Sequence, residues 1–282
     1  MNRRIMLPLL ALVLLVGGVV GEVVWSQDVV GAGDVSLVAD GDTLSAGRVD
    51  PQLDPRAEPA GPLEGRRIVI DPGHQLGNHN YPDEINRPVP AGGFEKPCNT
   101  TGTATNGGYP EATFAWRVSK LVKARLVRLG ATVRLTRHSN RQDRWGPCVD
   151  ARGRAGNKAP ADLKISIHGD GSTSSGARGF HVIAPTDRRP WTHDIYRSSR
   201  RLARESRAAL RSAGVPVANY IAGGDGLDFR SDLGTLNLSD IPTVMVELGN
   251  MRNRADARRM TTSAGRDAYA RALVRGVRHY LR

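Results

Sequence analysis

The alternation of apolar and polar positions between residues 66 and 282 predicts strands separated by helices. Short apolar runs bounded by glycine, proline or polar residues are typical of buried strands. Such runs predict strands at 67–70, 132–136, 163–167, 179–183 and 243–247. Because strands that alternate with helices form largely parallel sheets, we expect one α/β domain. Its mostly parallel twisted sheet should be flanked by helices on both faces.

The clearest helix follows Pro110, a residue type that suits the first turn of a helix. Apolar residues then recur every three or four positions up to Leu129 and form one stripe, and Gly130 ends the helix. Further helices are expected at 149–157, 191–213 and 264–281. Residues 75–110 are rich in glycine, proline and asparagine, which predicts a long loop, and such loops inside a domain are usually functional.

The start of the chain has the pattern of a secretory signal peptide. Arg3 and Arg4 precede an apolar run over 5–20. We expect residues 1–21 to be removed, which leaves Glu22 as the new N-terminus. The alternative is an uncleaved membrane anchor, since the apolar stretch is nearly long enough to span a bilayer. Glu22 at its end disfavours that alternative.

The remaining chain divides into a linker and one domain. Residues 22–65 are rich in glycine, aspartate, alanine and proline, a composition typical of a flexible linker. Residues 66–282 then form the expected catalytic domain. A chain of 282 residues is long enough for one such domain with a buried core.

The chain is strongly basic, with a formal net charge of +12 and a pI of about 10.4. An exported basic protein is attracted to anionic wall polymers and lipid headgroups. Nucleic acid is the usual alternative partner, but export argues against it, and no aromatic-interleaved basic motif is present. We therefore expect a monomer in the periplasm, cell wall or extracellular space, with no nucleic-acid partner and no stable membrane span after signal cleavage. Many arginines between 197 and 211 lie on an expected helix, where a solvated face is a sufficient explanation.

Cys98 and Cys148 are the two cysteines of the chain. In an exported protein an even count indicates a disulfide, although two free thiols are the alternative. In the chain-entropy model, closing the loop between Cys98 and Cys148 would stabilise the folded state by about 4 kcal/mol. Neither cysteine belongs to a CxxC pair, so a cysteine-based zinc site is not expected.

Four residues that can bind a metal or transfer a proton lie where expected elements begin or end. His74 and His168 follow strands, Glu247 ends a strand, and Glu111 lies in the first turn of the long helix. Each alone has an ordinary explanation, such as a loop histidine or a carboxylate near a helix dipole. Strand ends converge at one edge of a parallel sheet. Two histidines and one glutamate with an open fourth position form a known catalytic zinc set, beside which a further carboxylate can act as base.

The segment IVIDPGHQ at 68–75 resembles the opening motif of the zinc-dependent N-acetylmuramoyl-L-alanine amidases, the amidase type 3 family. Further matches follow in the same order, with GATVRLTR at 130–137, ADLKISIH at 161–168 and IPTVMVELGNMRN at 241–253. The resemblance covers about residues 66–282. The paired cysteines and the ELGNMRN segment are most similar to the actinobacterial branch of the family.

The resemblance implies roles for individual residues. His74, Glu111 and His168 match the zinc ligands of the family, and Glu247 matches its catalytic glutamate. Asp71 is expected either to orient His74 or only to cap the turn.

Three features do not follow the family pattern. Asp170 stands where members often have asparagine, LGNM replaces the commoner segment after the catalytic glutamate, and 223–237 is unusually rich in glycine and aspartate. These departures leave the expected zinc set intact but concern substrate contacts. His181 is not at a ligand position, and we interpret it as a packing or cleft-lining residue.

The implied activity is hydrolysis of the amide between N-acetylmuramic acid and L-alanine in peptidoglycan or its fragments. Zinc would activate water and polarise the carbonyl, and Glu247 would transfer the proton. No GxSxG or catalytic-cysteine motif supports a covalent route. The alternatives are a zinc peptidase that acts within the stem peptide, a non-catalytic peptidoglycan-binding module, or an exported structural protein. The lack of a recognisable wall-binding module favours small soluble fragments as substrate, whereas the charge favours polymeric wall.

Overall fold

The structure is a computed structural model that describes residues 61–282. The signal peptide expected at 1–21 lies outside the described residues, and so does most of the expected linker. Within 61–282, no helix is both long enough and apolar enough to cross a membrane.

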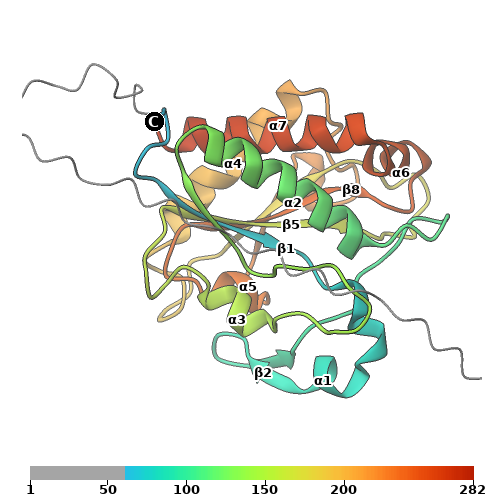
Figure 1. Ribbon diagram of the computed structural model, residues 1–282, viewed down its shortest axis with the longest axis horizontal. Helices are drawn as coiled ribbons and strands as arrows, with labels where there is room; N and C mark the ends of the chain where they lie inside the picture. The colour runs from blue at the N-terminus through green and yellow to red at the C-terminus, as the bar shows by residue number, and fades with distance from the viewer. Residues whose placement is uncertain (1–60) are drawn as a thin grey trace, which may run out of the picture. The chain divides into compact units, whose positions relative to one another are not determined.

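A six-stranded sheet in the order β4-β1-β5-β8-β6-β7 forms the centre of the domain (Figure 1). Its strands in chain order are β1 (Arg67–Pro72), β4 (Thr132–Leu135), β5 (Leu163–Asp170), β6 (His181–Pro185), β7 (Leu227–Arg230) and β8 (Thr243–Asn250). Strands β4, β1, β5 and β8 are mutually parallel, whereas β6 is antiparallel to β8 and parallel to β7. The expected mostly parallel sheet is therefore confirmed.

Three long helices cover one face of the sheet, which we call the helical face. They are α2 (Glu111–Arg128), α4 (Tyr196–Ser212) and α7 (Ser263–Tyr280), with the short α6 (Arg254–Thr261) before α7. Phe114 of α2, Leu202 of α4 and Leu273 of α7 belong to one buried cluster with Ile68 and Ile165 of the sheet. Burying this continuous apolar surface is the main favourable contribution to folding of the domain.

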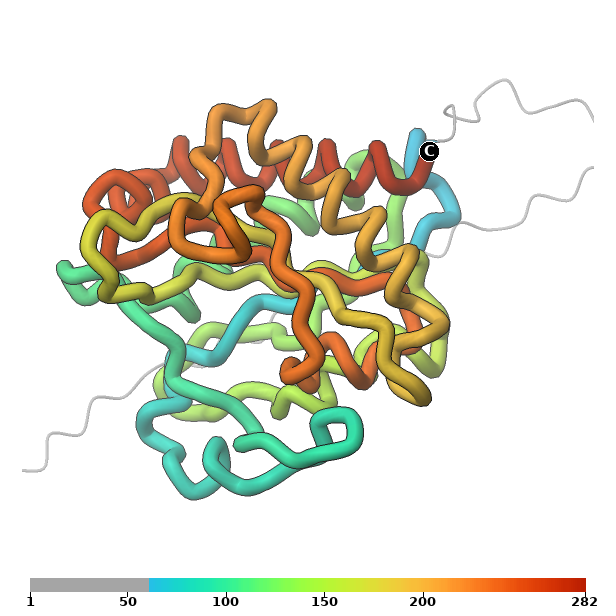
Figure 2. Tube along the Cα trace, turned by 180° about the vertical axis from the view of Figure 1, so that it is seen from behind, coloured from blue at the N-terminus to red at the C-terminus, as the bar shows by residue number. Residues whose placement is uncertain are grey.

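The opposite side of the sheet, which we call the cleft face, carries smaller elements. They are α3 (Val149–Arg154), α5 (Gly234–Asn237) and a hairpin of β2 (Pro88–Pro90) and β3 (Glu95–Pro97). Apolar packing on this side is split into small clusters, such as Ile183 with Leu236 and Met245. Helix α7 lies at the top and the hairpin at the bottom of both views, so they are on opposite sides of the sheet (Figures 1 and 2).

Several expected boundaries were wrong. Strands β5 and β8 continue to Asp170 and Asn250, so His168 and Glu247 lie inside strands rather than after or at the end of them. Helix α4 begins at Tyr196 rather than at residue 191. The preceding residues form turns in which the Thr192 hydroxyl donates to the Thr186 carbonyl and accepts from the N–H of Arg188.

The expected long loop at 75–110 contains regular elements. A 3-10 helix (Leu76–Asn80), α1 (Pro82–Asn86) and the β2–β3 hairpin all lie within it. Elements β7, α5 and α6 were not predicted either. All of these are short, and short elements carry too few positions for a helical or strand period to appear.

Candidate functional site

Three separate elements bring His74, Glu111 and His168 together on the cleft face. His74 follows β1, Glu111 is the first residue of α2, and His168 lies in β5. One ligand atom from each lies within 4.8 Å of the others. The distance from His74 Nε2 to Glu111 Oε1 is 3.1 Å, and the distance from His168 Nδ1 to the same oxygen is 2.9 Å. The convergence expected from the sequence is present for all three residues.

The backbone around His74 is shaped for this close approach. His74 has a φ of 51°, a left-handed conformation that is uncommon outside glycine and asparagine and clusters at functional sites. A Cβ on Gly73 would lie 2.6 Å from His168 Nδ1, so only glycine fits beside that ring. Gly102, with a φ of 75°, similarly leaves room for the Glu111 carboxylate, because a Cβ there would lie 2.8 Å from Oε2.

The ring of His74 is oriented by the segment that follows the hairpin. The carbonyl of Thr100 lies 3.0 Å from His74 Nδ1, so a proton on Nδ1 can be donated to it. The other nitrogen, Nε2, then faces Glu111 with a free lone pair. A histidine whose second nitrogen is fixed in this way has the tautomer needed to bind a metal.

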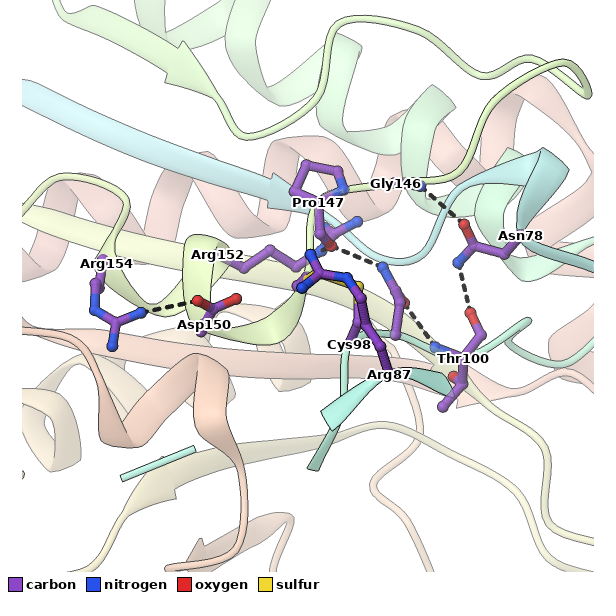
Figure 3. The surroundings of a disulfide bond; sticks show 11 residues. Asn78, Arg87, Cys98, Thr100, Gly146, Pro147, Asp150, Arg152 and Arg154 are labelled. Atoms are coloured by element: carbon purple, nitrogen blue, oxygen red, sulfur yellow. Dashed lines mark hydrogen bonds and ion pairs between the residues drawn. A yellow bond between two sulfur atoms is a disulfide. The ribbon is translucent and has the colours of Figure 1, made fainter. Parts of the chain in front are cut away.

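A disulfide between Cys98 and Cys148 fixes this segment to the start of α3, as expected from the sequence (Figure 3). Around it, the Val149 N–H donates to the Cys98 carbonyl at 2.7 Å. Asn78 donates to the Thr100 carbonyl at 2.6 Å and accepts from the Gly146 N–H at 2.9 Å. The disulfide and these hydrogen bonds therefore hold in place the segment that carries the Thr100 carbonyl, which faces His74.

Glu111 is held as a carboxylate at the start of a helix, where the dipole favours negative charge. Its Oε2 accepts from the Thr103 N–H at 2.9 Å, and its Oε1 lies 3.2 Å from the Gly169 N–H. Burial by itself raises the pKa of Glu111, but the charges and hydrogen bonds of His74 and His168 outweigh burial and lower it. Burial lowers the pKa of His168, whereas for His74 the nearby Glu111 carboxylate outweighs burial and raises the pKa.

Asp71 lies behind the three residues and contacts Arg152 rather than His74. Its Oδ1 accepts from Arg152 Nη1 at 2.6 Å, its Oδ2 accepts from the Ser166 hydroxyl at 2.6 Å, and the Thr136 hydroxyl donates to it as well. Burial opposes ionisation, but Arg152 and these hydroxyls hold the pKa of Asp71 well below its usual value. Arg152 in turn donates to the His74 carbonyl at 2.7 Å, so Asp71 supports the His74 turn through Arg152.

Arg137 is a further supporting residue for which the sequence predicted no role. Its guanidinium donates to the Gly73 carbonyl at 3.1 Å and to the Ala112 carbonyl at 2.7 Å. It therefore connects the turn that carries His74 to the helix that begins with Glu111. Burial and the positive charge of Arg152 lower the pKa of Arg137 to about 9. The available sequence signal was the position of this arginine at the end of the GATVRLTR segment, shortly after β4.

Glu247 lies beside His168 in the parallel register of β5 and β8. Its Oε2 is buried and has no hydrogen-bond partner among the described residues. Burial raises the pKa of Glu247 well above its usual value, and the charges of Glu111 and Asp170 raise it further. Glu247 and the His74, Glu111 and His168 side chains line one cleft with a volume of about 360 Å³. The structure thus brings all four expected residues together.

His181 lies opposite Glu247 on the antiparallel strand β6 but is not part of the group of possible metal ligands. It is buried and contacts Tyr220 edge-on, with 6.2 Å between the ring centroids. Asp170, where the family often has asparagine, accepts from the Tyr220 hydroxyl at 2.7 Å and lines the cleft.

The donor set of His74, Glu111 and His168 fits a zinc ion. Ligand atoms about 2.0–2.1 Å from a tetrahedral zinc ion stand about 3.3 Å apart. The observed separations of 3.1 and 2.9 Å are close to this value. Glu247, with its unpartnered oxygen, is positioned to hydrogen-bond a water or substrate group in the cleft.

Known proteins share both the sequence and the fold of this domain. The Amidase_3 family of N-acetylmuramoyl-L-alanine amidases matches residues 68–279. The chain is 44% identical over 222 residues to the N-acetylmuramoyl-L-alanine amidase Rv3717 of Mycobacterium tuberculosis, a match that covers 78% of this chain and 88% of that protein.

Two solved structures are also similar. The apo form of the amidase Ami1 from Mycobacterium abscessus has a TM-score of 0.71 at 42% identity, covering 78% of this chain and 100% of that one. Ami1 from Mycobacterium smegmatis has a TM-score of 0.71 at 38% identity, covering 78% and 98%. The resemblance predicted from the motifs is therefore confirmed: the chain belongs to the N-acetylmuramoyl-L-alanine amidase family of enzymes, Amidase_3.

Proposed function

We propose that this protein is a zinc-dependent hydrolase of the amide bond between N-acetylmuramic acid and L-alanine, acting outside the cytoplasm on peptidoglycan or its fragments. The observation that carries the proposal is the meeting of His74, Glu111 and His168 in one cleft with the unpartnered carboxylate oxygen of Glu247. The 44% identity to a named N-acetylmuramoyl-L-alanine amidase supports the assignment of the bond that is cleaved.

We propose His74, Glu111 and His168 as the zinc ligands. A zinc ion held there would supply Lewis-acid chemistry, lowering the pKa of water and polarising a carbonyl group. Arg152 and Arg137 keep the ligand-bearing backbone in place, and the Thr100 carbonyl keeps the His74 ring in the required tautomer. The protein therefore has no need to reorganise these groups during the reaction.

Glu247 is proposed as the general base and then the general acid. It accepts a proton from the attacking water while the water oxygen bonds to the lactyl carbonyl carbon. It then donates the proton to the alanine nitrogen as the C–N bond breaks. Burial and the negative charges of Glu111 and Asp170 raise the pKa of Glu247, which favours its service as an acid in the second step.

Mass spectrometry of digested muropeptides tests the proposal, with wild type, Glu247→Ala, and the exposed Glu64→Ala as a matched control. We expect wild type and Glu64→Ala to release intact stem peptides that begin with L-alanine, and a chelator to abolish this release. Glu247→Ala should keep the fold and the zinc but lose turnover by about 10²–10⁴-fold.

Two other outcomes would overturn the proposal. Cleavage within the stem peptide would identify a zinc peptidase instead. Binding of muropeptides by wild type without any cleavage, and without zinc, would identify a binding module.

A further inference from the structure

The outer surface of the helical face is strongly basic. Helix α4 contains a single acidic residue, Glu205, and six arginines: Arg197, Arg200, Arg201, Arg204, Arg207 and Arg211. Helix α7 contains Asp267 and four arginines: Arg266, Arg271, Arg275 and Arg278. Helix α2, whose only acidic residue is the cleft carboxylate Glu111, adds Arg117, Lys120, Lys123, Arg125 and Arg128.

The exposed arginines form stripes along the helices. Arg204 and Arg211 of α4 are seven residues, or about two helical turns, apart, and Arg271, Arg275 and Arg278 of α7 follow one another at spacings of four and three. Residues at these spacings lie on the same side of a helix. All five are exposed to solvent. Each stripe runs about 10 Å along its helix, because its end residues are seven positions apart at a rise of about 1.5 Å per residue.

The stripes of α4 and α7 lie close together. A Cβ on Gly276 of α7 would approach the Cα of Ser206 of α4 to 3.1 Å, which shows how closely the two backbones cross. Figure 2 shows both helices on the same side of the sheet. Small residues at this crossing therefore produce one continuous basic surface instead of two separate ones.

The few acidic groups on this surface have basic neighbours within it. Asp267 forms ion pairs with both Arg125 and Arg271. Glu205 lies 3.8 Å from His279 Nδ1. No acidic partner lies within ion-pair distance of Arg204, Arg211, Arg275 or Arg278 anywhere in residues 61–282.

The surplus of positive charge makes this surface attractive to anions. The guanidinium groups of the four arginines that make no ion pair within residues 61–282 can bind them. The planar guanidinium fork pairs with phosphate oxygens in two parallel hydrogen bonds, so a phosphate group is a suitable partner for these arginines.

We propose that the outer surface of α2, α4 and α7 binds an extended phosphodiester polymer, on the opposite side of the sheet from the cleft. A polymer, rather than a single anion, matches exposed arginines that are divided between two neighbouring helices. A lipid bilayer fits less well. Among the described residues the exposed large hydrophobic side chains are Phe94 and Val127, and surface-bound helices need several such groups to insert.

The basic surface and the cleft lie on opposite sides of the sheet. Because the cleft opens on the other face, a bound polymer leaves the cleft free. The polymer would then hold the protein near polymeric wall, without requiring a separate wall-binding module. This inference does not depend on the proposed reaction, since polymer binding is measured without turnover.

Binding of labelled, lipid-free poly(glycerol phosphate) to the full chain tests the proposal, measured by fluorescence anisotropy at several salt concentrations. The variant is Arg204→Ser/Arg275→Ser/Arg278→Ser. We expect it to bind about tenfold or more weakly at low salt. The slope of log K against log salt should be less steep by about 2, which corresponds to about 0.7 per lost phosphate contact. Thermal unfolding and hydrolysis of a soluble muropeptide should not change.

A matched control removes three exposed cations elsewhere on the chain, in the variant Arg134→Ser/Lys158→Ser/Arg178→Ser. Arg134 and Lys158 line a pocket with residues of α3 on the cleft face. This variant has the same change in charge and should bind the polymer almost as wild type does. Equal weakening in both variants would overturn the proposal, because net charge alone would then explain binding. Binding to phosphatidylglycerol vesicles without binding to the polymer would overturn it in favour of a bilayer.

Discussion

On the helical face of the sheet, Ile68, Ile165 and Val246 pack into one apolar cluster, whereas alternate positions of the same strands carry Asp71, Ser166 and Glu247 on the cleft face. Successive residues of a strand point to opposite faces, so a single set of strands serves both purposes. Apolar packing stabilises the domain from one side. The other side can then hold buried charges whose arrangement is dictated by chemistry.

The two faces should respond differently to substitution. Apolar packing tolerates changes in shape that leave the rest of the core intact. Removing one member of a buried ionic network leaves its partner charged and unpaired, which costs about as much stability as truncating a large core side chain. Stability alone does not separate these cases, but zinc binding at the proposed site would.

The largest effect is expected for Arg152→Met on the cleft face. This change leaves the buried carboxylate of Asp71 without its ion pair and removes the donor to the His74 carbonyl. We expect the free energy of unfolding to fall by about 3–5 kcal/mol. Zinc affinity, measured by competition with a chromogenic chelator, should weaken about 10–100-fold.

Leu202→Ala is the matched change on the helical face. It removes a fully buried side chain of α4, and we expect a loss of about 2–5 kcal/mol with an unchanged zinc Kd. Equal losses of zinc affinity in the two variants would show that the faces are not independent.

A smaller effect is expected from removing the disulfide in Cys98→Ser/Cys148→Ser. The cysteines are 50 residues apart, and losing the constraint should lower the free energy of unfolding by about 2–4 kcal/mol. Because the disulfide supports the segment that carries the Thr100 carbonyl, zinc binding should weaken about tenfold. An unchanged zinc Kd in a destabilised protein would limit the role of the disulfide to stability.

The smallest effect concerns Lys164, a buried residue whose ammonium donates to the Arg152 carbonyl at 3.1 Å. Burial lowers the pKa of Lys164 to about 7, compared with about 10.4 in an unfolded chain. Between these values the unfolded chain holds a proton that the folded chain has lost. The contribution of Lys164 to the free energy of unfolding therefore rises with pH, by at most about 1.4 kcal/mol per pH unit.

Lys164→Met removes this titration, so urea unfolding at pH 7, 8 and 9 should give a flatter pH profile than that of wild type. If the free energy of unfolding depended on pH equally in the two proteins, Lys164 would not be a buried amine that titrates in this range.

The helical face could be predicted from the sequence to a large extent. The apolar stripe from Ala115 to Leu126 identified α2, because a long amphipathic helix repeats its pattern many times. The parallel strands followed from their apolar runs. The short elements of the cleft face did not, since α5 has only four residues and β3 only three.

The candidate site was likewise predictable only in part. The proposed ligand residues could be singled out from the sequence because their types and motif spacing carry chemical information. The roles of Arg137 and the Thr100 carbonyl could not be found, because they act through backbone atoms that no sequence pattern specifies. Asp71 was expected to orient His74 or to cap the turn, and its direct partner proved to be Arg152.

The central claim is that His74, Glu111 and His168 hold one zinc ion beside Glu247. An anomalous difference map at the zinc absorption edge, from crystals of the protein grown with zinc, tests it most directly. We predict one strong peak about 2.0–2.2 Å from His74 Nε2, His168 Nδ1 and a Glu111 oxygen, with Glu247 outside bonding distance. A peak bound by other residues, such as Asp170 or His181, or no peak in this cleft, would contradict the account.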